Sequence, residues 1–175
     1  MPAFSTITID HDPGQPRIAR LTLNRPDHYN AINEAMPGEI RAAIDWAQAT
    51  EAVHVVIVEG AGKGFCGGYD LGAYAEQQQD HPCQQEGHPW DPMRDYAHMK
   101  RFTEDFMALW RSAKPTIAKV HGAAVAGGSD IALCCDLLVM AEDARIGYMP
   151  TRVWGCPTTA MWTFRLGPLR AKQMM

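Results

Sequence analysis

Two glycine-rich segments have the composition of sites where main-chain N–H groups bind a ligand. They are GAGKGFCGGYDL at 60–71 and HGAAVAGGSDIALCCD at 121–136, and in each an apolar run leads into small residues. Small residues let a carbonyl oxygen approach N–H groups that larger side chains would cover, and the N-terminus of a following helix adds partial positive charge. Two such turns that face each other would form an oxyanion hole, although each alone is equally well explained by tight packing.

Other kinds of site are poorly supported by residue type and spacing. The segment around Ser129 lacks the second glycine of a GxSxG turn, and no histidine is placed for a triad, so we do not expect a serine hydrolase. His81, Cys83 and His88 lack a fourth ligand at structural-zinc spacing, which favours a surface loop over a metal site. The five cysteines form no CxxC pair, and we expect reduced thiols.

Hydrophobic periodicity predicts the elements that position the two turns. Alternating runs at 7–10 and 18–23 flank a DPGQP turn and predict a β-hairpin. Apolar residues three and four apart predict a helix over about 33–49, with regular helix beginning near Pro37. The run VHVVIVEG is almost continuously β-branched and predicts a strand buried on both faces, which requires covering helices.

Strand and helix signals continue along the rest of the chain. Residues 72–93 are rich in Gln, His, Asp and Pro and predict a long loop or mobile lid. A helix follows, and the Lys114-Pro115 junction ends it before a strand at 116–120. A strand and turn at 121–128, a helix at 129–135 and a strand at 137–142 come next, and 165–175 begin another helix. This order predicts one α/β domain over residues 1–175.

Composition and charge argue against several classes of partner. The 175 residues are 46% hydrophobic, enough for one core, and the formal net charge of −4 arises from interspersed charges without a basic stripe. We therefore expect neither nucleic acid nor an anionic membrane as a partner. No apolar run approaches the roughly 20 residues of a membrane span, and the first ten residues do not resemble a signal peptide, so we expect a cytoplasmic protein.

Three segments together resemble the crotonase superfamily, the enoyl-CoA hydratase/isomerase family. LNRPDHYNAIN, GAGKGFCGGYDL and HGAAVAGGSDIALCCDLLVMAEDARIGY are similar to its three sequence blocks, in the same order and at compatible spacing. The resemblance implies the crotonase-like (ClpP/crotonase) spiral of β-β-α units. It also implies that most of the family's C-terminal helical region, which drives assembly of homotrimers or hexamers, is missing from these 175 residues.

The resemblance also assigns roles to individual residues. The backbone N–H groups of Tyr69 and Gly127 fall on the two oxyanion donors, and the Tyr69 side chain is expected to shape the acyl pocket. Asp70 and Asp136 match positions at which a carboxylate accepts backbone N–H bonds. Arg25 suits a phosphate contact, unless it merely caps a strand end. The family's coenzyme A contacts fall on Arg25, Asn30, Ala31, Ile32, Lys63, Gly68, Asp70 and Leu71.

The acid and base of the family are only partly kept. Hydratases of the family use two glutamates, and here Asp130 stands at the first position and Pro150 at the second. Because proline transfers no proton, Asp130 would act alone, as in single-carboxylate members, unless it only caps or orients the glycine turn. Tyr148 is expected to line the pocket and is a second candidate proton donor. Dehalogenases of the superfamily carry a nucleophilic aspartate at the position of Thr158, which disfavours covalent displacement here.

Taken together, these assignments predict an enzyme that binds an acyl-CoA substrate and stabilises its thioester enolate, with no metal and no further cofactor. The leading reaction is the lyase reaction that hydrates a 2-enoyl-CoA to a 3-hydroxyacyl-CoA. The alternatives are double-bond isomerisation, thioester or C–C hydrolysis, and a catalytically silent acyl-CoA-binding protein. Trp90, Met93, Phe102 and Phe106 are expected to line or close a pocket for a bulky apolar acyl chain.

Overall fold

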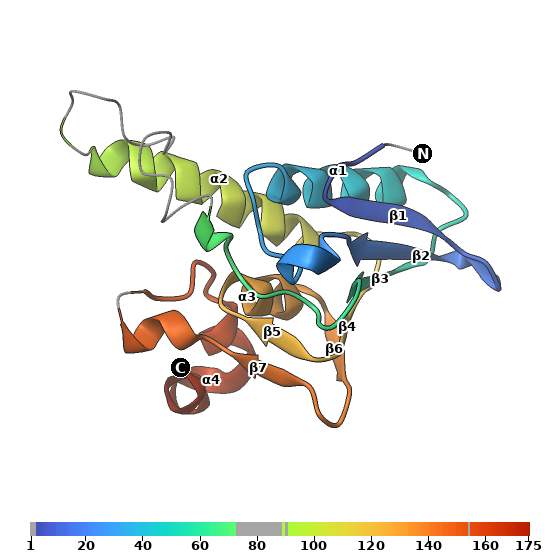
Figure 1. Ribbon diagram of the computed structural model, residues 1–175. Helices are drawn as coiled ribbons and strands as arrows, with labels where there is room; N and C mark the ends of the chain where they lie inside the picture. Colours follow the sequence, from blue (N-terminus) through green and yellow to red (C-terminus); the bar gives the residue numbers. More distant parts are fainter. Residues whose placement is uncertain (1–2, 73–88, 90, 154) are drawn as a thin grey trace.

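The main sheet of the protein is mostly parallel (Figure 1). The computed structural model describes residues 3–72, 89, 91–153 and 155–175, and among these the sheet has the strand order β1-β2-β3-β4-β6. The strands are β1 (Ile7–Asp12), β2 (Gln15–Leu23), β3 (Val55–Gly60), β4 (Thr116–Val120), β5 (Ala123–Val125), β6 (Leu137–Met140) and β7 (Arg145–Gly147). The first two strands form the predicted antiparallel hairpin, and every later pair in the sheet is parallel.

A smaller second layer of backbone lies beside the main sheet. It contains the parallel pair β5 and β7, and single bridges join Cys66 to Ala124 and Ile32 to Tyr69. Each of β2, β3, β4 and β6 is thus followed by a short second-layer segment and then by a helix. This repeat of β-β-α units confirms the predicted α/β spiral.

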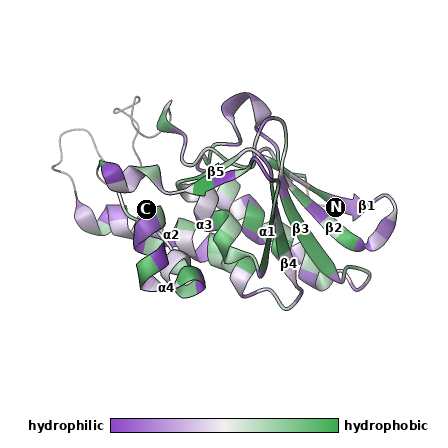
Figure 2. Cartoon of the chain, turned by 90° about the horizontal axis from the view of Figure 1, so that it is seen from below, coloured by the Kyte–Doolittle hydropathy of each residue, from purple (hydrophilic) through white to green (hydrophobic). Residues whose placement is uncertain are grey.

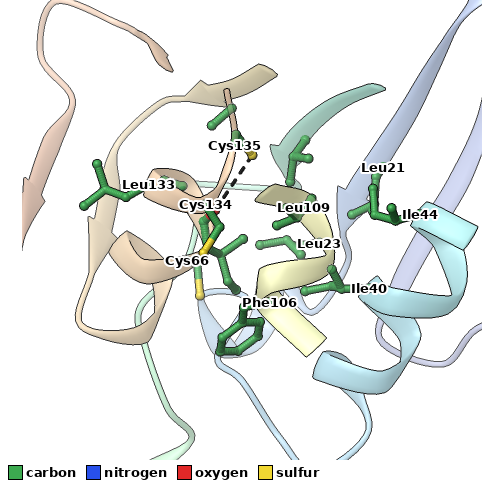
Figure 3. Close-up of a cluster of buried hydrophobic side chains, with 14 of the residues drawn as sticks. Leu21, Leu23, Ile40, Ile44, Cys66, Phe106, Leu109, Leu133, Cys134 and Cys135 are labelled. Carbon is green, nitrogen blue, oxygen red and sulfur yellow. Dashed lines mark hydrogen bonds between the residues drawn. The ribbon is translucent and has the colours of Figure 1, made fainter. Parts of the chain in front are cut away.

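Helices supply one side of the hydrophobic core. They are α1 (Met36–Ala49), α2 (Pro92–Trp110), α3 (Gly127–Cys134) and α4 (Met161–Met174), whereas the short helices η1 (Pro26–His28) and η4 (Met149–Arg152) contribute no buried residue. α1 packs against α2, α2 against α3, and α3 against α4. The core residues labelled in Figure 3 come from β2, α1, α2, the segment after β3, and α3 with the residue that follows it; they are Leu21, Leu23, Ile40, Ile44, Cys66, Phe106, Leu109, Leu133, Cys134 and Cys135.

One face of β3 differs from the prediction. Val56 and Val58 are fully buried, as expected, and β3 and β4 are coloured mainly hydrophobic in Figure 2. On the opposite face, however, the side chains of β3 are only partly buried. Arg20 and Lys119 pair with Glu59 there, from the strands on either side. The expectation of burial on both faces is therefore wrong, because charged residues of three neighbouring strands share the second face.

Two helix starts also differ from the prediction. α3 begins at Gly127, two residues before the expected start at 129, because the glycine pair forms the first helical turn. α2 begins at Pro92, where the Asp91 side chain accepts a hydrogen bond from the Met93 N–H at 2.9 Å, so the end of the expected 72–93 loop is helical. Most of that loop, with His81, Cys83, His88 and Trp90, lies outside the described residues.

The C-terminal segment forms α4, as the amphipathic pattern of 165–175 predicted, although the helix starts earlier, at Met161. Its regular geometry breaks at Gly167, which has φ 73° and precedes Pro168. In the described part of the chain, no helix combines the length and apolar character needed to cross a membrane.

Burial makes three cysteines inert components of the core, which agrees with the expectation of reduced thiols. Cys66, Cys134 and Cys135 are buried and free (Figure 3). Burial raises the pKa of the Cys66 and Cys134 thiols to about 12, and that of Cys135 is raised as well. A thiol that stays protonated is a poor nucleophile and a poor metal ligand, so these side chains act in packing.

Candidate functional site

The two glycine-rich segments lie side by side. The Cys66 N–H donates to the Ala123 carbonyl at 2.9 Å, and the Val125 N–H donates to the Cys66 carbonyl at 3.0 Å. At Gly68, which has φ 95°, a side chain would begin 2.8 Å from the Cβ atom of Ala126. The small residues predicted from the sequence therefore permit direct contact between the two turns.

The first turn of α3 is pressed against the same segment. A Cβ atom on Gly128 would lie 2.5 Å from the Cys66 carbonyl oxygen, and one on Gly127 would lie 2.9 Å from the Tyr69 ring. Ala126, immediately before the helix, has φ 50° and ψ −126°, a conformation that costs a residue with a side chain about 1 to 3 kcal/mol. Close packing, not helix propensity, thus determines which residues fit here.

The backbone around Tyr69 pairs with Ile32. The Ile32 N–H donates to the Gly68 carbonyl at 2.8 Å, and the Asp70 N–H donates to the Ile32 carbonyl at 2.9 Å. Successive N–H groups of an extended chain point to opposite sides, so the Tyr69 N–H points away from Ile32. Gly127 is the first residue of α3, where N–H groups have no intrahelical acceptor.

A cavity of about 630 Å³ opens beside these turns. That volume is typical of sites that enclose a small organic ligand. The walls come from both turns, from α2 and from the segment after β7, and the lining residues are Gly67, Tyr69, Leu71, Asp95, His98, Met99, Phe102, Val125, Ala126, Tyr148, Met149, Pro150, Val153, Gly155, Cys156 and Thr158.

The aromatic residues expected at the pocket have separate positions. Phe102 lines the cavity and stacks on the Tyr69 ring, with ring centroids 6.2 Å apart. Phe106 is instead fully buried in the core and does not line the cavity, because it lies four residues further along α2, beneath the site. Met93 is 67% exposed near the start of α2 and is not a lining residue either.

Asp130 lies behind the cavity and does not line it. Its side chain is fully buried on α3, and its Oδ2 atom accepts hydrogen bonds from the Thr158 Oγ1–H at 2.9 Å and the Thr158 N–H at 3.3 Å. The Oδ1 atom accepts from the Thr159 hydroxyl at 3.1 Å. Burial raises the pKa of Asp130 to about 6, against the lowering effect of the threonine hydrogen bonds. A carboxyl group with this pKa can gain and lose a proton near neutral pH.

Tyr148 and Pro150 form part of the wall next to Thr158. Burial, followed by the nearby charge of Asp130, raises the pKa of the Tyr148 phenol, so the hydroxyl remains protonated and can donate a hydrogen bond. Pro150 lines the cavity at the position where the family pattern places a second carboxylate. The wall therefore presents an apolar ring at that point.

A charged cluster on the α2 side of the cavity was missed by the sequence reading. The Glu34 carboxylate forms an ion pair with Arg101 and lies 3.3 Å from Nε2 of His98, whose side chain lines the cavity together with Asp95. Thr158 was likewise not predicted as a functional residue. Neither the Glu34 and His98 pair nor the Asp130 and Thr158 pair falls within one motif, so no local pattern could have revealed them.

The residues predicted to contact coenzyme A lie mostly around the first turn. The Arg25 guanidinium pairs with Asp70 at 2.9 Å and donates to a backbone carbonyl. Asn30 is fully buried, and its amide nitrogen donates to three carbonyls within 61–65 at 2.8, 3.0 and 3.1 Å. Both side chains thus hold the first turn together, whereas Lys63 is exposed to solvent.

The remaining predicted contacts differ in their accessibility. Ile32 is buried beneath the turn, Ala31 is partly buried, and Leu71 is 60% exposed and lines the cavity. Asp136 accepts the Thr116 N–H at 2.8 Å, which confirms its predicted structural role.

No group of three or more His, Cys, Asp or Glu side chains within the described ranges converges to hold a metal ion.

Known proteins share both the sequence and the fold. The sequence model of the family described as enoyl-CoA hydratase/isomerase matches residues 14–175. The chain belongs to this family. Its fold is the crotonase-like fold, since a crystal structure of an enoyl-CoA hydratase from Mycobacterium smegmatis superposes with a TM-score of 0.85 at 42% identity, covering 98% of this chain and 59% of that one.

Some relatives of the chain are named hydratases and others isomerases. The "Probable enoyl-CoA hydratase EchA14" of Mycobacterium tuberculosis is 38% identical over 127 residues, 73% of this chain and 44% of the relative. A peroxisomal Delta(3,5)-Delta(2,4)-dienoyl-CoA isomerase of Arabidopsis thaliana is 30% identical over 145 residues, 82% of this chain and 51% of the relative. The chain thus spans about half the length of these relatives.

Proposed function

We propose that the protein binds an acyl-CoA thioester and stabilises its enolate with the backbone N–H groups of Tyr69 and Gly127. The observation that carries this proposal is the contact between the two glycine turns at the edge of a cavity, with the buried carboxyl group of Asp130 directly behind that wall. Membership of the enoyl-CoA hydratase/isomerase family supports the same conclusion.

The two N–H groups would polarise the thioester carbonyl. Negative charge that develops on the oxygen is then stabilised by preorganised donors, each worth about 3 kcal/mol in comparable sites. The helix N-terminus at Gly127 adds favourable partial charge. In a 2-enoyl thioester this polarisation makes Cβ electrophilic, so that water can add there.

Hydration of a 2-enoyl-CoA is the reaction that we assign first. A water molecule would attack Cβ and lose a proton to the acid–base site centred on Asp130, and the same site would return a proton to Cα. The pKa of about 6 suits both steps, because the carboxylate and the carboxylic acid are both accessible near neutral pH.

Double-bond isomerisation is the second candidate, favoured by Pro150. A 1,3 proton transfer needs one acid–base group that removes a proton from one carbon and returns it to another, whereas the two-glutamate hydration mechanism needs two groups. Proline lines the cavity where a second carboxylate is expected. The similarity to the plant dienoyl-CoA isomerase is compatible with this alternative.

The lining of the cavity favours a bulky apolar acyl chain. Met99 and Phe102 from α2 face the same cavity as Met149 and Val153 from the segment after β7. Apolar contacts of this kind select by size and shape, since each added methylene contributes about 0.8 kcal/mol when it is buried.

The test mixes the protein with crotonyl-CoA and, separately, with a longer or aromatic 2-enoyl-CoA. Loss of the conjugated-thioester absorbance without release of free thiol, abolished in Asp130→Asn, is expected for a hydratase. A shift of the double bond without water addition would select the isomerase, and release of thiol would select a hydrolase. Binding of acyl-CoA without turnover of either substrate or of a 3-enoyl-CoA would contradict the proposal and indicate a silent binding protein.

A further inference from the structure

The carboxyl group of Asp130 has no direct route to a ligand in the cavity. Its side chain has no exposed surface, and it is not a lining residue. Thr158 lies between them, because its side chain lines the cavity and its Oγ1–H donates to Asp130 Oδ2 at 2.9 Å. The Thr158 hydroxyl therefore offers a hydrogen-bonded path for a proton between Asp130 and a bound acyl group.

Two neighbouring threonines bind the same carboxyl group but differ in position. Thr158 donates a hydrogen bond to Oδ2 of Asp130, is partly exposed and lines the cavity. Thr159 donates a hydrogen bond to Oδ1 of Asp130 at 3.1 Å, is 5% exposed and does not line the cavity. The chain thus contains a matched pair of hydroxyl groups, of which only one faces both the carboxyl group and the cavity.

We propose that the Thr158 hydroxyl is the catalytic residue that exchanges protons with the substrate, and that Asp130 acts through it. This inference rests on the proposed function and specifies how its proton moves. In the forward direction the proton of the attacking water passes to Thr158 Oγ1, while the original Thr158 proton passes to Asp130 Oδ2. The C–O bond forms at Cβ and the electron pair of the double bond is held as the thioester enolate.

The return step restores both residues. Asp130 gives its proton back to Thr158 Oγ1, and Thr158 transfers its own proton to Cα as the enolate collapses. The net change is addition of H and OH across the double bond, with no oxidant and no metal in the balance. The same relay would serve an isomerase, since the first proton would then come from Cγ instead of water.

The experiment compares Thr158→Val, Thr158→Ser and Thr159→Val for hydration and isomerisation of enoyl-CoA substrates, and for incorporation of deuterium at Cα in D2O. Valine keeps the shape of threonine but removes the hydroxyl. We expect Thr158→Val to lower kcat and the rate of deuterium incorporation by about 100-fold or more with little change in KM, because general acid–base groups contribute about 10² to 10⁴. Thr158→Ser keeps a hydroxyl group, so its kcat and its rate of deuterium incorporation should lie within about tenfold of wild type.

Thr159→Val is the matched control. It also removes one hydrogen bond to Asp130, so a purely structural role of the threonines predicts similar losses in both valine variants. The relay predicts that Thr159→Val stays within about tenfold of wild type, and that Asp130→Asn combined with Thr158→Val is no slower than the worse single variant, since residues that act as one unit are not additive.

Each outcome decides between the relay and its alternatives. Full activity in folded Thr158→Val, or equal losses in Thr158→Val and Thr159→Val, would overturn the relay and leave the proposed function standing. A loss in Thr158→Val that serine does not restore would overturn it as well. A wild-type protein without turnover or Cα exchange on 2-enoyl-CoA or 3-enoyl-CoA would overturn the proposed function, and the relay with it.

Discussion

The two sides of the cavity are built in opposite ways. We call residues 66–69 and 126–130 the turn floor, and the cavity-facing residues of α2 the α2 wall. The floor is built mainly of backbone, the carboxyl group of Asp130 lies buried behind it, and the residues of α3 that contribute to it are all buried. The wall offers side chains from a helix whose first turns are exposed and project beyond the main sheet (Figure 1). Groups that must be held precisely thus lie on the densely packed side.

The contrast predicts that changes in the floor affect catalysis and stability, whereas changes in the wall affect the choice of substrate. A side chain in the floor meets backbone atoms that cannot move aside. A side chain in the wall meets other side chains, which can adopt new rotamers at low cost.

The largest effect is expected for Gly128→Ala. The new Cβ would lie 2.5 Å from the Cys66 carbonyl oxygen, so the two turns must separate. We expect a loss of about 3 kcal/mol or more in the free energy of unfolding, together with loss of turnover. Chemical denaturation and kcat/KM measure both. The control is Gly38→Ala in α1, where a Cβ meets nothing within 4 Å and a gain of about 0.5 to 1 kcal/mol is expected. Equal changes in the free energy of unfolding and in kcat/KM for the two variants would contradict the distinction between the turn floor and an exposed helix surface.

Asp130→Asn is expected to lower kcat/KM by about 10² to 10⁴ while the protein remains folded. For hydration, Asp130 must be ionised to accept the proton, so the wild-type kcat/KM should fall as the pH drops below about 6. The residual activity of the variant should lack this ionisation. A wild-type profile that is flat between pH 5 and 8 would contradict the assigned role of this carboxyl group.

The same variant should separate stability from activity. The folded pKa of Asp130, about 6, lies above the ordinary value of 3.8, so the folded protein binds the proton more tightly than the unfolded chain. Its contribution to stability is therefore fully present below pH 4 and is lost as the pH rises through 6, by about 2 to 3 kcal/mol at pH 7. We expect the stability of Asp130→Asn relative to wild type to increase by that amount between pH 4 and pH 7, measured by denaturation at each pH. A constant difference would show that burial does not perturb the carboxyl group.

A smaller and selective effect is expected for Met99→Ala in the α2 wall. Shortening this lining residue should lower kcat/KM for a long 2-enoyl-CoA by about tenfold, because a lost apolar contact in a pocket changes transition-state binding by about 1 to 3 kcal/mol. The rate with crotonyl-CoA should be nearly unchanged, since a short chain does not reach the wall. Parallel losses for both substrates would indicate that the wall also positions the reacting atoms.

The smallest effect is expected for Glu34→Gln. Glu34 pairs with Arg101 and approaches His98, but its side chain is 49% exposed, and exposed ion pairs contribute only about 0 to 1 kcal/mol. The free energy of unfolding should therefore change by less than about 1 kcal/mol, and kcat/KM by less than about fivefold. A loss of kcat/KM as large as that of Asp130→Asn would indicate that residues of the α2 wall take part in the reaction.

Much of the fold could be predicted from periodicity and glycine placement. The hairpin, the helix starting near Pro37 and the strand at Thr116–Val120 were expected, because each is encoded by neighbouring residues. The partial exposure of the second face of β3 was not expected, because Arg20 and Lys119, which pair with Glu59 there, come from other strands. The start of α3 was placed two residues late, because glycine usually ends a helix, whereas here tight packing favours it in the first turn.

The candidate site also combines features encoded by neighbouring residues with contacts that only the tertiary structure decides. Small residues visible in the chain predicted the two turns, and the resemblance to the family assigned roles there to Tyr69, Gly127 and Asp130, which stay predictions. Tertiary structure alone decided that Asp130 is screened from the cavity by Thr158, 28 residues away, and that Arg25 and Asn30 hold the first turn together. Such contacts join residues from different elements, and a contact between elements depends on how their surfaces pack, which neither segment specifies on its own.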